Sequence, residues 1–93
     1  MADKNNLVEV AGSDVLAKTG HGIIKAIYVN PTDRTWIIRD GTSVSGTALF
    51  TVGSAAAANG PISMPYINHP CSDGIFVDNT TAGTVGTLVI VFE

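Results

Sequence analysis

Short runs of apolar, mostly β-branched residues, separated by glycine, proline, asparagine and aspartate, extend along the chain. Runs of this length are typical of β-strands, and the residues between them favour turns. No stretch carries the apolar spacing of an amphipathic helix. The pattern therefore predicts seven or eight short strands, over residues 7–10, 14–18, 22–30, 35–40, 48–52, 62–66, 74–79 and 87–92.

The clearest predicted strand is the run 22–30, GIIKAIYVN. Side chains alternate between the two faces of a strand. Strict alternation places Lys25 and Ile27 on one face, and Ile24 and Tyr28 on the other. Because a lysine then interrupts an apolar face, the pattern indicates a strand that is covered on both sides.

The other strands differ in the position that they are expected to take in a sheet. The run 87–92 (TLVIVF) is apolar on both faces, so we expect it to be central or buried beneath another subunit. Pro65 confines the strand at 62–66 to an edge, and residues 68–73 are expected to form a loop. The bulky side chains expected in the core are Trp36, Phe50, Phe76 and Phe92.

Strands repeated at this spacing predict an all-β fold: a single antiparallel β-sandwich or a jelly-roll-like barrel. A length of 93 residues leaves room for one domain. We expect residues 11–93 to form the sandwich, and residues 1–10 to form an N-terminal arm or a short edge strand.

The composition points to a chain that covers part of its surface with neighbours. Charged residues make up 14% of the chain and hydrophobic residues 45%, against about 25% charged residues in an average soluble domain. The net charge of −3 argues against a nucleic-acid partner, which requires a basic surface. The apolar runs are too short to span a membrane, and the polar N-terminus predicts no signal peptide. We therefore expect synthesis in a cytoplasm and no membrane partner.

Few residues could carry catalytic or metal chemistry. A single cysteine excludes a disulfide within the chain. His69 and Cys71 are a conceivable base–nucleophile pair, but we expect Pro70 between them to splay the two side chains. His69, Cys71 and Asp73 could hold a metal, yet a structural zinc site needs four ligands. The sequence therefore predicts no enzyme, no catalytic residue, no metal site and no cofactor.

One succession of motifs carries a family resemblance. The segments are 18–24 (KTGHGII), 28–30 (YVN), 37–43 (IIRDGTS) and 45–47 (SGT). They resemble the small β-sandwich virion proteins of tailed bacteriophages, in which a TGxGxL…VxVN…xxxYDGTSxxGT run precedes a Gly/Thr turn and a final strand. The resemblance covers most of the chain, with Arg39 where the family has an aromatic residue.

The resemblance implies a structural virion protein. We expect a capsid decoration (cement) protein on the capsid surface, made in the cytoplasm of a bacterial host. It would form a homo-oligomer, in the first instance a trimer, and bind the phage major capsid protein. The residues that we expect at its interfaces are Asp3, Leu7, Val8, Ala56, Ala57 and Asn59.

A second interpretation is a head–tail, tail or fibre component that binds glycans on the host surface. Exposed aromatic side chains on a β-sheet face would be its signature, and Tyr28 and Tyr66 are the residues that could provide it.

Overall fold

The computed structural model describes residues 6–30, 32–53, 62–81, 83 and 85–93, and within these residues the chain forms strands and turns but no helix. The predicted all-β class is therefore confirmed. The strands are β1 (Asn6–Val10), β2 (Val15–Thr19), β3 (Gly22–Val29), β4 (Thr35–Asp40), β5 (Thr47–Gly53), β6 (Ile62–Met64), β7 (His69–Cys71), β8 (Gly74–Thr81) and β9 (Leu88–Phe92).

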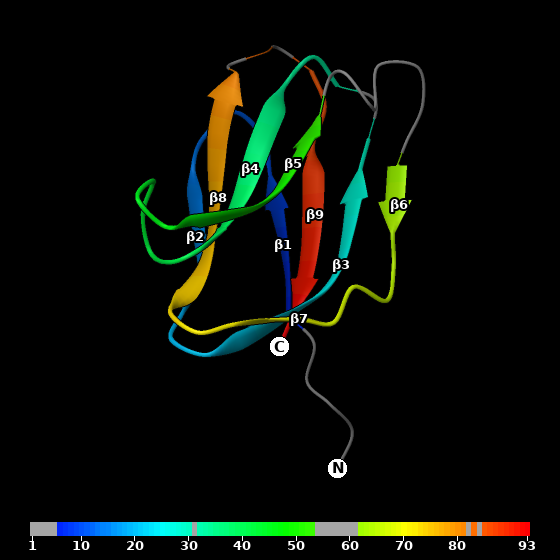
Figure 1. Ribbon diagram of the computed structural model, residues 1–93. Helices are drawn as coiled ribbons and strands as arrows, with labels where there is room; N and C mark the ends of the chain where they lie inside the picture. Colours follow the sequence, from blue (N-terminus) through cyan, green and yellow to red (C-terminus); the bar gives the residue numbers. More distant parts are fainter. Residues whose placement is uncertain (1–5, 31, 54–61, 82, 84) are drawn as a thin grey trace.

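The strands form two antiparallel sheets packed face to face (Figure 1). Sheet A has the order β1-β9-β3-β6, and sheet B has the order β2-β8-β4-β5. In sheet A, β6 pairs with one half of β3 and β7 pairs with the other half. The two short strands therefore act as one interrupted strand, and the sandwich is eight-stranded in effect.

The connectivity is that of a long hairpin rolled up on itself. β1 pairs with β9, β2 with β8, β3 with β6 and β7, and β4 with β5. Each pair lies one step closer to the hairpin turn at residues 41–46. Two four-stranded sheets connected in this order are a jelly roll, which is one of the two forms that the sequence predicts.

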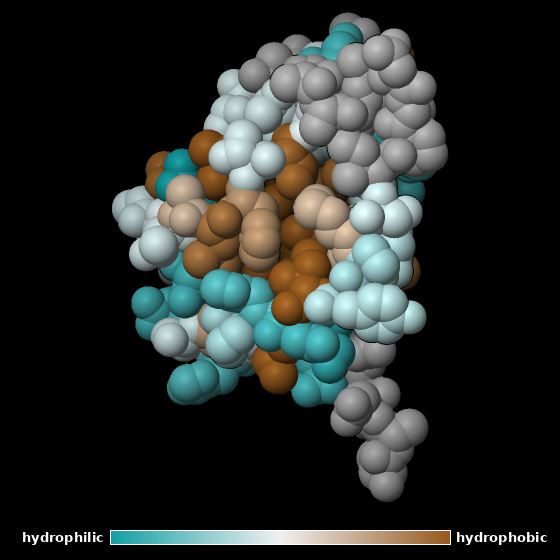
Figure 2. Space-filling model, turned by 45° about the vertical axis from the view of Figure 1, so that its right-hand side comes forward, coloured by the Kyte–Doolittle hydropathy of each residue, from teal (hydrophilic) through white to brown (hydrophobic). Residues whose placement is uncertain are grey.

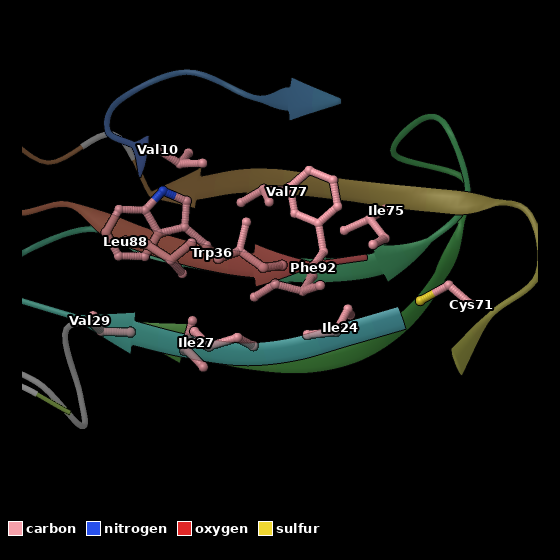
Figure 3. Close-up of a cluster of buried hydrophobic side chains, with 13 residues drawn as sticks. Val10, Ile24, Ile27, Val29, Trp36, Cys71, Ile75, Val77, Leu88 and Phe92 are labelled. Carbon is pink, nitrogen blue, oxygen red and sulfur yellow. The ribbon is translucent and has the colours of Figure 1, made fainter. Parts of the chain in front are cut away.

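The core lies between the sheets and is formed from the inner faces of both (Figure 3). Trp36 is fully buried and Phe92 nearly so, as predicted. Phe76 was wrongly expected in the core: Ile75 and Val77, on either side of it in β8, are the fully buried residues, so Phe76 faces outward.

Phe50 lies at the margin of the core rather than within it. It is half-buried, on the side of the sandwich that lies between β5 and β6. Figure 2 faces this side and shows apolar atoms between the two strands. The partly buried side chains from this part of the chain that pack against the core are Leu49, Phe50, Met64 and Ile67.

A β-bulge changes which side of β3 faces the core. Ile24 pairs with Phe92, whereas Ala26 pairs with the preceding residue, Val91. One extra residue in a strand reverses the alternation beyond it. Ile24 and Ile27 are consequently both fully buried, and the prediction that they lie on opposite faces was wrong.

Residues 68–73 were expected to form a loop, but β7 occupies part of this segment. Its central residue, Pro70, pairs with Ile23 at the edge of sheet A. Proline lacks an N–H group and is tolerated at an edge. The sequence signals a break here, and the structure has a short edge strand instead.

The corner between β1 and β2 is attached to the sandwich by three hydrogen bonds. Trp36 Nε1 and Asn79 Nδ2 both donate to the Ala11 carbonyl, at 2.9 and 3.1 Å. The Asn79 backbone N–H donates to Asp14 Oδ1 at 2.7 Å. Val10, just before the corner, is fully buried. Residues 6–10 are thus an edge strand that contributes to the core.

The turn after β3 is held against the segment before β9. Thr32 Oγ1 donates to the Val85 carbonyl at 2.8 Å. The Arg34 guanidinium donates to the carbonyls of Gly83 and Gly86. Gly86 adopts a φ of 96°, and a Cβ there would lie 2.2 Å from Thr32 Cβ. This end of the sandwich therefore requires glycine at position 86.

Candidate functional site

A groove on the outer face of sheet A brings the two candidate tyrosines together. It has a volume of about 280 Å³, and β3, β9 and the segment between β6 and β7 line it. We call it the tyrosine groove. Its lining includes Lys25, Ala26, Tyr28, Tyr66, Asn68 and Val91.

The backbone between β6 and β7 presents Tyr66 to solvent. Tyr66 and Asn68 have φ values of 61° and 50°, in the left-handed region. For residues other than glycine this region costs roughly 1–2 kcal/mol, although asparagine enters it more readily. The intervening Ile67 donates its N–H to the Lys25 carbonyl at 2.9 Å, and its side chain packs against the core. Ile67 thus anchors the segment, while Tyr66 is 89% exposed.

The other side of the groove is formed by β3. Tyr28 lies outward on this strand and is 40% exposed. The β3 bulge brings Lys25 and Ala26 to the groove together with Tyr28. Among the described residues, no acidic side chain forms an ion pair with Lys25. The groove therefore combines two phenol rings, an ammonium group and an amide.

His69 and Cys71 lie on the same face of β7, with Pro70 between them. Both point toward the interior, because alternate residues of a strand share a face. The His69 ring packs edge-on against the Phe50 ring, with centroids 5.7 Å apart.

The Cys71 thiol is a weak nucleophile. It is almost completely buried. Burial, and secondarily the charge of Asp40, raise the pKa of the thiol to about 11. Because the thiolate is the reactive form, the thiol is unreactive near neutral pH.

The suggested metal ligands do not form a cluster. Within the described part of the chain, no group of three or more histidine, cysteine, aspartate or glutamate side chains could hold an ion. The backbone N–H of Asp73 donates a hydrogen bond to Asp40 Oδ1 at 2.9 Å.

Asp40, which was not among the predicted site residues, organises the turn between β7 and β8. Its carboxylate accepts hydrogen bonds from the backbone N–H groups of Ser72, at 3.0 Å, and Asp73. These bonds lower the pKa of Asp40 from its usual 3.8, with smaller contributions from Gly74 and His69. Its role is therefore structural.

Arg39 occupies a place where the resembling family has an aromatic residue, and it has local partners. Its Nη2 lies 3.1 Å from Asp78 Oδ2, and Nη1 donates to the Gly46 carbonyl at 2.9 Å. The side chain therefore links β4 to β8 and to the β4–β5 turn, and it performs a structural task in this chain.

The edge formed by β1 and β2, which we call the β1–β2 edge, exposes apolar side chains. Leu7 is 65% exposed and Leu16 is 46% exposed. On the outer face of sheet A, Leu7 lies opposite Val91. This edge lies on the opposite side of the sandwich from β5 and β6, because each strand ends its sheet.

The predicted interface residues are only partly within the described chain. Leu7 lies outward, at the β1–β2 edge. Val8 is half-buried and packs against the core. The remaining four, Asp3, Ala56, Ala57 and Asn59, lie outside the described residues.

Comparisons with protein-family models, curated proteins and solved structures give no match to this chain. In the described part of the chain, no helix has the length and apolar character needed to cross a membrane.

Proposed function

We propose that this chain is a non-enzymatic structural protein of a virion: a capsid decoration subunit of a tailed phage. It would form a ring-shaped homo-oligomer, in the first instance a trimer, that binds the major capsid protein. The observation that carries the proposal is that two opposite sides of the sandwich carry apolar surface. The β1–β2 edge has exposed apolar side chains, and the side between β5 and β6 has partly buried ones (Figure 2).

Physical chemistry favours covering both sides. The outward residues of an antiparallel sandwich are usually polar, whereas Leu7 and Leu16 are exposed here. Edge strands also carry unpaired N–H and C=O groups that can pair with another chain. Contact between subunits would remove both kinds of surface from water.

Two different apolar sides suit a ring. When one surface of a subunit contacts a different surface of the next, the contacts are heterologous, and a suitable rotation closes them into a ring. We propose that the β1–β2 edge of one copy contacts the β5–β6 side of the next copy. The low charge of the chain, 14%, agrees with a subunit that is largely surrounded by others.

The jelly-roll fold and the motif resemblance support the assignment to a virion. Jelly rolls occur in viral capsid proteins, and also in lectins and cupins, so the fold alone does not give the function. The weakly nucleophilic Cys71 and the structural role of Asp40 are consistent with a protein that has no catalytic task.

The test compares Leu7→Asp with Val44→Asp. Val44 is 57% exposed in the β4–β5 turn and is a matched control. We expect the wild type and Val44→Asp to be oligomeric by light scattering, and to co-sediment with purified capsids of a phage that encodes the protein. A charge in an apolar contact should cost several kcal/mol. Leu7→Asp should therefore weaken both the association of the subunits and their binding to capsids at least tenfold.

Two results would contradict the proposal. One is a wild-type protein that is monomeric and is absent from purified particles. The other is a Leu7→Asp variant that assembles and binds like the wild type. Thermal melts of both variants establish that they are folded.

A further inference from the structure

We propose that the tyrosine groove binds the terminal sugar of an acidic glycan, a pyranose ring that carries a carboxylate. This binding site goes beyond the proposed assembly role, and it is assayed on the isolated protein without capsids.

The size of the groove suits a single ring. Its volume of about 280 Å³ lies just below the ~300–1,000 Å³ of pockets for drug-sized ligands. The groove is open to solvent beside Tyr66, whose side chain is exposed. A terminal sugar could therefore enter while the rest of the glycan stays outside.

The groove provides both surfaces that a sugar ring needs. A pyranose has an apolar face of C–H groups and a rim of hydroxyls. The rings of Tyr28 and Tyr66 offer large, rigid apolar faces, and their hydroxyls and the Asn68 amide offer hydrogen bonds. Val91 and Ala26 add apolar surface.

The charge of the groove selects among sugars. Lys25 lines the groove, and none of the lining residues is acidic. No described acidic side chain pairs with the Lys25 ammonium group. An ammonium group without a partner, next to apolar surface, favours an anionic ligand. The groove thus carries a local positive charge in a chain whose net charge is −3.

The backbone conformation supports a role in binding. Tyr66 and Asn68 both adopt left-handed conformations, and these place an aromatic ring in solvent. Strained residues of this kind concentrate at ligand-binding segments, where the surrounding structure holds them. Here the hydrogen bond from Ile67 to Lys25 holds the segment against β3.

The groove adjoins the surfaces proposed for the ring. It opens on the outer face of sheet A, over β3. Leu7 lies on the same face, opposite Val91, and Ile67 of the β5–β6 side lies between Tyr66 and Asn68. The ring contacts use the two sides of the sandwich, and the part of the groove over β3 lies between them. An oligomer would therefore present several grooves, and several weak sites on one particle give strong overall binding.

The experiment titrates the purified protein with a matched pair of sugars, methyl galacturonide and methyl galactoside, which differ in a carboxylate at C6. Amide chemical shifts in NMR spectra report the position and strength of binding. We expect the galacturonide to shift the amides of residues 25–28 and 66–68 with a Kd of about 1 mM. The neutral galactoside should bind at least fivefold more weakly.

Two variants separate the contributions of the rings and the charge. Tyr66→Asn removes the ring but keeps a residue that accepts the left-handed conformation, and it should weaken galacturonide binding at least tenfold. Lys25→Gln should abolish the preference for the acidic sugar. Val44→Ser, an exposed change in the β4–β5 turn, should leave both titrations unchanged.

The proposal is overturned if neither sugar shifts these amides at 20 mM, or if both bind with equal affinity to the wild type. It is also overturned if Tyr66→Asn, shown to be folded by its spectrum, binds like the wild type. Capsid association of the same variants is measured separately, so a failure here leaves the assembly proposal standing.

Discussion

Asp40 shows how one side chain can fix a connection between the two sheets. It lies at the end of β4 in sheet B, and it accepts hydrogen bonds from the backbone of the turn that follows β7 in sheet A. The bonds join residues more than thirty positions apart. The sequence identifies Asp40-Gly41 as a turn, because these residues favour turns, but it gives no information about the distant partner.

The lowered pKa of Asp40 predicts a dependence of stability on pH. Its folded pKa lies below 3.8, so the unfolded chain binds the proton more readily. The stabilisation is complete above this value and is lost as the pH falls through the folded pKa. Asp40→Asn should lower the free energy of unfolding by about 1 kcal/mol at pH 7, and the difference from the wild type should shrink in strong acid.

Urea unfolding at pH 7 and at pH 2.5, followed by fluorescence of the single, fully buried Trp36, measures this effect. Glu9→Gln on the exposed side of β1 is the control, and it should change stability little at either pH. The assigned role would be refuted if the free energy of unfolding differed between wild type and Asp40→Asn by the same amount at both pH values.

The exposure of single residues was predictable to different degrees. Trp36 was placed correctly, because it alternates with Ile38 and both are fully buried. Tyr28 and Tyr66 are exposed, as the glycan-binding interpretation requires. Their position in one groove could not be read from the sequence, because it depends on the bulge in β3 and on the pairing of β6 and β7 with that strand.

At the scale of elements, turn residues determined where strands end, and bulges determined which side faces inward. Each of the eight predicted strands corresponds to a strand of the structure, because glycine, proline and aspartate mark the boundaries. The bulges after Ile24 and near Leu16 leave no comparable signal. A single extra residue reverses the faces, so alternation gave the wrong side for part of β3.

The segment before β9 yields a prediction about glycine. At Gly86, φ is 96° and a Cβ would overlap Thr32; at Gly20, φ is 83° but a Cβ would have no neighbouring atom within 4 Å. Gly20→Ala should therefore lower the free energy of unfolding only by the cost of placing alanine at a positive φ, roughly 1–2 kcal/mol. Gly86→Ala should cost at least about 2 kcal/mol more, because the turn containing Thr32 and Arg34 must move.

Thermal melts of the two variants check this prediction. For a domain of this size, 1 kcal/mol corresponds to a Tm shift of about 4–8 °C. Gly86→Ala should thus melt clearly below Gly20→Ala. Equal melting temperatures would mean that the contact of Thr32 and Arg34 with the segment before β9 contributes little to stability.

For the whole molecule, the fold class could be predicted, but the pairing of strands could not. Strand length and spacing are local properties and predict a sandwich. The nested pairs β1–β9 and β2–β8 join opposite ends of the chain, and no local signal specifies them. The apolar character of β9 on both faces was the one useful indication, and β9 is indeed central in sheet A.

The nested arrangement predicts that the N-terminal segment is part of the folding unit. Removing residues 2–10 deletes β1, one of the two strands that pair with β9, together with the fully buried Val10. We expect a loss of roughly 3–5 kcal/mol, a large fraction of the 5–15 kcal/mol that stabilises a typical domain. Urea unfolding monitored by Trp36 fluorescence measures this loss.

A truncated chain with the stability of the full chain would show that β1 is only loosely attached. If the expected loss is found, failure of the truncated chain to bind capsids would reflect unfolding, and the Leu7→Asp variant would be the better test of the interface.

The pairing of β1 with β9 sets Asn6 opposite Phe92, and Figure 1 shows β1 beginning at the end of the molecule where β9 finishes. A peptide or a fluorescent protein fused before residue 6 or after residue 92 would consequently leave the sandwich at one pole. A short linker could also join the two ends, and a circular permutant could then begin and end in the 41–46 turn. The chain is therefore a suitable display scaffold in which the choice of fusion end hardly changes where the cargo is carried.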